Sequence, residues 1–121
     1  MRAQLGLCAI GLLIAGTVNA SAFSASFKWC GGPSPVFLLS GVPNGTKTIQ
    51  FHMIDLDKPD YNHGGGNVAY TGQKTIACGA LNNYSPPSPP SGSHSYRFDV
   101  TAIGAGGTLG SASFTRKFPE K

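Results

Sequence analysis

The sequence predicts an all-β protein, an antiparallel β-sandwich with few or no helices. Its 121 residues include 17 Gly and 9 Pro, and with Ser and Asn they interrupt the chain about every ten residues, a spacing typical of short strands joined by turns. Two long segments alternate apolar and polar side chains with the period of a strand buried on one face. After residue 20, no apolar repeat of helical period is long enough to predict a helix.

The two long segments are residues 46–56 and 93–103. The first alternates Ile49, Phe51 and Met53 with polar residues that include His52, so we interpret His52 as a structural residue of this strand. The second places Tyr96, Phe98, Val100 and Ala102 on one face. Shorter strands are expected at residues 36–39, 67–70, 75–78 and 109–118. The twelve aromatic residues exclude a disordered chain, and the length favours one domain.

Residues 1–20 have the pattern of a secretory signal peptide. A positively charged start precedes an apolar run, and two small-x-small sequences follow, where a peptidase would cut after Ala20 or Ala22. The apolar run is shorter than the roughly 20 residues of a comfortable membrane span. We therefore expect one exported β domain over residues 21–121, secreted or periplasmic, with no transmembrane segment once the signal is removed.

Export changes how the cysteines are interpreted. Cys8 lies in the signal peptide, which leaves Cys30 and Cys78 in an oxidising compartment. We expect them to form a disulfide, which would close a loop of roughly 48 residues and stabilise the domain by about 4 kcal/mol in the chain-entropy treatment. A redox or metal-binding pair is the less favoured alternative, because no C-x-x-C motif is present.

Charge and motifs exclude several functions. The net charge of +4 is spread thinly along the chain, whereas a nucleic-acid groove needs clustered Lys and Arg. Such a charge gives only a mild preference for small anions or acidic surfaces. Neither a G-x-S-x-G nor an H-E-x-x-H motif occurs. We therefore expect no nucleic-acid partner, no cofactor and no catalytic site.

Two segments differ from ordinary turns. Residues 61–66 place His63 against three glycines, where backbone can approach a ligand closely. Residues 84–94 form a stiff proline-rich loop that ends in His94 and is followed by Tyr96. Because binding residues are concentrated on loops held by a rigid scaffold, both segments are candidate walls of a pocket.

Four pieces of sequence form an ordered pattern. They are Ser34-Pro35 with residues 40–47, the D-L-D-K-P turn at 55–59, H-G-G at 63–65, and P-S-P-P-S-G-S-H-S-Y at 87–96. Taken in this order, they resemble the phosphatidylethanolamine-binding protein (PEBP) family, especially its small bacterial YbhB/YbcL-like branch. The resemblance runs from about residue 27 to residue 119, which is nearly the whole mature chain. Each piece alone is weak, but four in the right order are specific.

The resemblance implies a β-sandwich with a small anion-binding pocket at one end. Its ligand-binding residues, carried over position by position, are Asp55, Asp57, Pro59, His63, Pro87, Pro89, Pro90, His94 and Tyr96. The two imidazoles and the Tyr hydroxyl would bond a phosphate or carboxylate, and Asp55 would orient one His. The sequence departs from the family pattern at Pro86, which replaces a Gly, and at Gly64, which replaces an aromatic residue and is expected to open one wall.

Other functions remain as alternatives. The proline loop suits a protein-interaction module such as an inhibitor or a secreted effector. A hydrolytic enzyme would use Asp55, His63 and His94 in acid–base chemistry, but no activated nucleophile stands out. A metal site through His52, His63 and His94 is not expected, because their spacing matches no standard site. Asp55 and Asp57 could also simply cap a turn.

Overall fold

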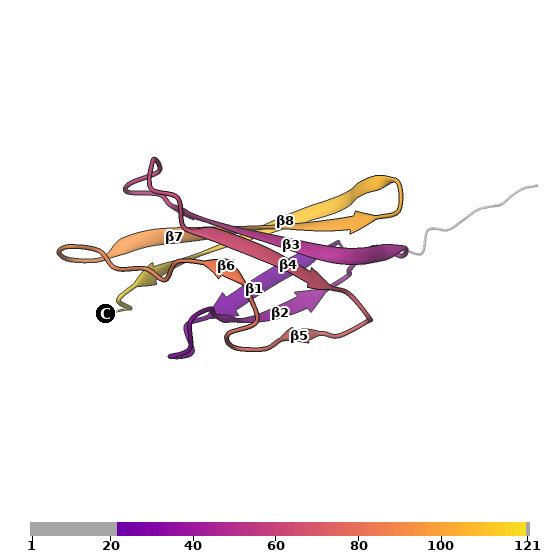
Figure 1. Cartoon of the computed structure of the whole chain (residues 1–121), viewed down its shortest axis with the longest axis horizontal. Coiled ribbons are helices and arrows are strands. Elements are labelled where there is room, and N and C mark those ends of the chain that lie inside the picture. Colours follow the sequence, from indigo (N-terminus) through magenta and orange to yellow (C-terminus); the bar gives the residue numbers. More distant parts are fainter. Residues whose placement is uncertain (1–21, 121) are drawn as a thin grey trace, which may run out of the picture.

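The computed structural model describes residues 22–120, and the predicted signal peptide lies outside them. The described residues form eight β-strands and no helix, arranged as two facing antiparallel sheets (Figure 1). Accordingly, this part of the chain contains no helix that could cross a membrane. The strands are β1 (Ser24–Lys28), β2 (Val36–Ser40), β3 (Thr46–Asp55), β4 (Gly64–Ala69), β5 (Thr75–Ile76), β6 (Asn83–Tyr84), β7 (His94–Gly104) and β8 (Gly107–Phe118).

The larger sheet has the strand order β6-β4-β3-β7-β8, and the smaller has the order β1-β2-β5. At the centre of the larger sheet, β3 pairs with β7 over nearly its whole length, and this register places Asp55 opposite Tyr96. The two long strands recognised from their alternation are therefore neighbours. The last residue of β3 and the first residues of β7 therefore lie at the same end of the sheet.

The core lies between the two sheets and is rich in aromatic residues. Phe37 of β2 packs against Phe51 of β3 and Phe98 of β7, with ring centroids 4.5 and 4.8 Å apart. Phe27 of β1 meets Phe98 edge to face at 5.0 Å. All four rings are buried, and burying a side chain of this size stabilises a fold by roughly 1.5–3 kcal/mol. This buried aromatic core forms the scaffold that carries the loops.

The all-β prediction is confirmed, as are all six predicted strands, with shifted ends. The strand expected at residues 67–70 begins earlier, at Gly64, and the one expected at 75–78 ends at Ile76. The prediction omitted β1, which has only Ala25 and Phe27 as buried residues, and β6, which is two residues long. β1 offers only two apolar positions, one of them a small Ala, and β6 is followed directly by the proline-rich loop, so neither segment stands out in the sequence.

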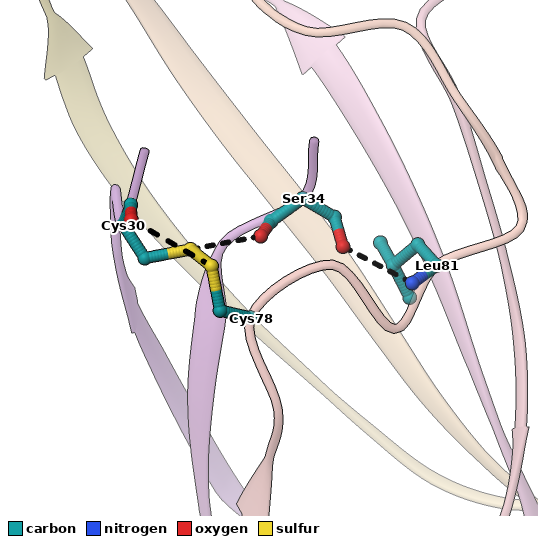
Figure 2. Close-up of a disulfide and its surroundings, with 4 residues drawn as sticks. All are labelled: Cys30, Ser34, Cys78 and Leu81. Carbon is teal, nitrogen blue, oxygen red and sulfur yellow. Dashed lines mark hydrogen bonds between the residues drawn. A yellow bond between two sulfur atoms is a disulfide. The ribbon is translucent and has the colours of Figure 1, made fainter. Parts of the chain in front are cut away.

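The predicted disulfide is confirmed (Figure 2). It joins Cys30, in the loop between β1 and β2, to Cys78, just after β5, and both residues are exposed. Beside it, the buried Ser34 accepts hydrogen bonds from two backbone amides, through its carbonyl oxygen from Gly79 (2.9 Å) and through its hydroxyl from Leu81 (3.0 Å). Cys30 Sγ also lies 3.0 Å from the Ser34 carbonyl oxygen, a contact and not a hydrogen bond, because a disulfide sulfur carries no hydrogen.

Candidate functional site

The site is built around Asp55, the last residue of β3, whose side chain is buried with only 4% of the residue exposed. Its Oδ1 accepts hydrogen bonds from the backbone N–H groups of Asp57 (2.9 Å) and Lys58 (3.1 Å), which closes the turn after the strand. Its Oδ2 lies 2.7 Å from His94 Nδ1. The Asp55 carboxylate thus caps the turn with one oxygen and orients His94 with the other.

The turn is also tied to the beginning of β7. Asp57 Oδ2 accepts a hydrogen bond from the Ser95 amide (2.7 Å), and the Leu56 amide donates to the Ser95 carbonyl (2.8 Å). These bonds hold Asp55 and His94 in register. Burial of the Asp55 carboxyl raises its pKa, but the hydrogen bonds from His94, Asp57 and Lys58 and the interaction with the His94 charge outweigh burial, so its pKa is lowered below 3.8. The carboxylate is therefore ionised at neutral pH.

His63 approaches from the other side, immediately before β4. Its ring is buried, and Nδ1 lies 2.7 Å from the carbonyl oxygen of Ser85, at the start of the proline-rich loop. The Ser85 amide in turn donates to the His63 carbonyl at 2.8 Å. This reciprocal pair fastens the proline loop to the His-Gly-Gly segment, two stretches that lie 22 residues apart in sequence.

The Tyr96 ring is a neighbour of both imidazoles. Its ring centroid lies 5.5 Å from that of His63, in an edge-to-face arrangement, and 6.2 Å from that of His94, in a stacked one. Tyr61 adds a further ring, 4.5 Å from His63. Burial, followed by the charge and hydrogen bonding of Asp55, raises the pKa of Tyr96 to about 12. Its hydroxyl therefore keeps its proton at neutral pH.

These side chains surround a cavity of about 300 Å³. Six of the nine predicted ligand-binding residues line it. They are Asp55, His63, Pro89, Pro90, His94 and Tyr96. The structure thus brings together the D-x-D-x-P turn, the segment around His63 and the proline loop at one end of the sandwich, which is the convergence that the sequence resemblance required.

The remaining three predicted residues do not line the cavity. Asp57 bonds the start of β7, and Pro59 is exposed in the turn. Pro87 lines a separate hollow, next to Trp29 and the disulfide. Four further lining residues were not predicted: Lys58, Tyr61, Pro86 and Ser88. All four lie within or directly beside the motif segments, so their position was the available signal, but residue type does not show which side of a loop faces inward.

The expectation for Gly64 is wrong. Gly64 does not line the cavity around His63 and His94, so it does not open a wall there. Its φ of +69° favours glycine, and a Cβ on it would lie 2.2 Å from the Asn83 carbonyl oxygen. The residue is glycine because β6 passes close to β4. It lines instead an open hollow on the outer face of the larger sheet, together with His52, which is exposed there and separate from the other two histidines.

Asp55, Asp57 and His94 could supply one metal-ligand atom each, within 4.8 Å of one another. Their atoms already have partners, however, since both carboxylates accept backbone amides and His94 Nδ1 faces Asp55. This cluster is accounted for by the turn and by the orientation of His94.

No protein-family model matches the sequence, and no curated protein matches it significantly. Among solved structures, the chain matches the crystal structure of a candidate PEBP homolog from Chlamydia trachomatis D/UW-3/CX. The TM-score is 0.61 and the identity is 18%, over 83% of this chain and 99% of that one. At this identity the likeness shows the fold. It confirms the resemblance at that level, and the chain is a β-sandwich of the PEBP type.

Proposed function

We propose that this protein is an exported small-ligand binding module that holds a phosphate-bearing or other anionic group between His63 and His94. The observation that carries the proposal is the convergence of two imidazoles, from segments about thirty residues apart, on one cavity of about 300 Å³. In each ring Nδ1 is already engaged, so Nε2 is the nitrogen left for a ligand. A PEBP-type sandwich is in keeping with a binding protein.

The chemistry of the lining supports an anionic ligand. The cavity has two imidazoles, the Tyr96 hydroxyl and the Lys58 ammonium, whose side chain is 61% exposed. Hydrogen bonds to a charged group contribute roughly 1.5–3 kcal/mol each. Pro89 and Pro90 restrict the loop before a ligand arrives, so little conformational entropy remains to be lost on binding.

The proposal includes export. The Cys30–Cys78 disulfide is consistent with an extracellular or periplasmic location. We infer that residues 1–20 are the signal peptide and that residues 21–121 are the mature domain. Mass spectrometry of the protein recovered from its host would identify the cleavage point.

The test is a titration of residues 21–121 with inorganic phosphate and, separately, with phosphoethanolamine, followed by histidine NMR signals. We expect the His63 and His94 resonances to shift together, and His63→Ala or His94→Ala to weaken binding at least tenfold, because each removes a charge-assisted bond. His52→Ala is the matched control, since His52 lies on the outer face of the sheet, and it should leave affinity unchanged. Shifts confined to other regions would refute the proposed site.

A further inference from the structure

We infer that the cavity selects among anions by the protons that they carry, preferring a tetrahedral oxyanion that retains an O–H, such as hydrogen phosphate, to one of equal charge without it, such as sulfate. This inference rests on the proposed function, because it concerns the same cavity. It goes beyond that function by naming the protonation state of the ligand as the basis of specificity.

The partner of each Nδ1 decides which nitrogen of the ring carries the hydrogen. His63 Nδ1 faces the Ser85 carbonyl oxygen, which can only accept a hydrogen bond. His94 Nδ1 faces the ionised Asp55 carboxylate, which likewise can only accept. Both rings are therefore held in the tautomer with hydrogen on Nδ1. In the neutral state, each Nε2 then presents a lone pair.

The number of hydrogens available for the two Nε2 contacts differs between the two anions. A contact between Nε2 and an anion oxygen is a hydrogen bond only if one hydrogen lies between the two atoms, on the ring or on the ligand. Two such contacts need two hydrogens. Hydrogen phosphate brings one, so one more proton must be taken up from solution. Sulfate brings none, so two must be taken up.

Other charged and titratable groups also lie near the rings. The Asp55 carboxylate contacts His94, and a carboxylate oxygen of Asp57 lies within 4.8 Å of the nearest ligand atoms of Asp55 and His94. Lys58 is largely exposed and lies 3.6 Å from Asp60, which partly offsets its charge. The rings of Tyr61 and Tyr96 lie beside His63. Because two carboxylates adjoin the site, an anion needs the added protons to offset repulsion.

Each proton that a ligand must draw from solution weakens its binding about tenfold for every unit by which the pH rises, because the proton becomes tenfold scarcer. Sulfate must draw one proton more than hydrogen phosphate does. We therefore expect hydrogen phosphate to bind at least about tenfold more tightly than sulfate at about pH 8. The ratio of the two affinities should narrow as the pH falls to about 5.5.

The experiment is calorimetry of residues 21–121 with sodium phosphate and with sodium sulfate, in two buffers of different ionisation enthalpy at equal ionic strength. EDTA is present throughout, because two lone pairs could also capture a trace metal. At about pH 8 we expect uptake of about one proton with phosphate and about two with sulfate. NMR titration supplies the affinities where the heat is small.

His63→Gln provides a second readout. The Gln side-chain amide can donate at the position of Nε2 without taking up a proton, so binding should persist while uptake falls by about one for each anion. His52→Gln, on the outer face, should change neither quantity. Equal affinity and equal uptake for the two anions would overturn the inference and leave the proposed function standing. Binding of neither anion at about pH 5.5, where protons for the two contacts are most readily drawn from solution, would overturn both.

Discussion

Asp55 is the residue on which most of the site depends, because it closes a turn through one oxygen and orients His94 through the other. Asp55→Asn keeps an oxygen for the turn amides but removes the charge. Since the folded state lowers the pKa of Asp55, its contribution is present above the unfolded pKa and is lost as pH falls through the folded one. We expect the variant to lose about 1–3 kcal/mol of unfolding free energy at neutral pH.

Urea unfolding at about pH 7 and at about pH 3 tests this expectation. The gap in unfolding free energy between wild type and Asp55→Asn should narrow in acid, because Asp55 takes up a proton more readily in the unfolded state than in the folded one. Asp99→Asn is the control. Asp99 pairs with Arg97 at 2.8 Å, but both side chains are more than a third exposed, and exposed pairs of this kind contribute little. A gap of equal size at both pH values would mean that the Asp55 charge is not responsible.

At the scale of the element, β4 depends on glycine for its place between β3 and β6. A Cβ on Gly64 would meet the Asn83 carbonyl oxygen at 2.2 Å, and its φ is +69°. Gly64→Ala should therefore cost both backbone strain, about 1–2 kcal/mol, and the separation of two strands, roughly 1–3 kcal/mol more.

Gly92→Ala separates these two costs. Gly92 has a similar φ of +63°, but a Cβ there would meet nothing within 4 Å. Chemical denaturation should show the larger loss for Gly64→Ala and only the strain for Gly92→Ala. Equal losses would mean that the close approach of β6 is unimportant, and that Gly64 is retained for its backbone angle alone.

The sequence predicts elements well where alternation is long and poorly where it is short. Thr46–Asp55 and His94–Gly104 are recognisable because a core-facing residue recurs at every second position. Asn83–Tyr84 could not be recognised, because it follows another Asn and leads directly into the proline-rich loop. Its pairing with β4 depends on Gly64, a residue that suggested an open wall instead. Propensity alone does not reveal which backbone will pass nearby.

The candidate site shows the same division. The types and order of its residues identify the segments that meet, because Asp, His and the prolines occur at fixed offsets within short motifs. The direction of each side chain depends on the turn. Asp57 therefore bonds Ser95, and Pro87 lines a different hollow. Their sequence neighbours Lys58 and Ser88 line the cavity. Side-chain direction within loops is a tertiary property, which sequence offsets do not encode.

For the whole molecule, the two sheets differ greatly in their internal support. The larger sheet is held by the long β3–β7 and β7–β8 pairings, whereas in the smaller one β5 contributes two residues. The Cys30–Cys78 disulfide spans the loops that flank this weak edge. It therefore supports the side of the sandwich that has fewer backbone hydrogen bonds.

Replacing both cysteines by alanine should lower the unfolding free energy by about 4 kcal/mol, the cost of losing closure of a loop of this length. The loss should be local as well as global. Hydrogen exchange should quicken most at the amides of Gly79 and Leu81, which bond Ser34 beside the disulfide, and least in β3 and β7. Dithiothreitol should reproduce the effect in the wild type and do nothing to the double variant. A loss below about 1 kcal/mol, or uniform exchange across both sheets, would show that the aromatic core alone holds the smaller sheet in place.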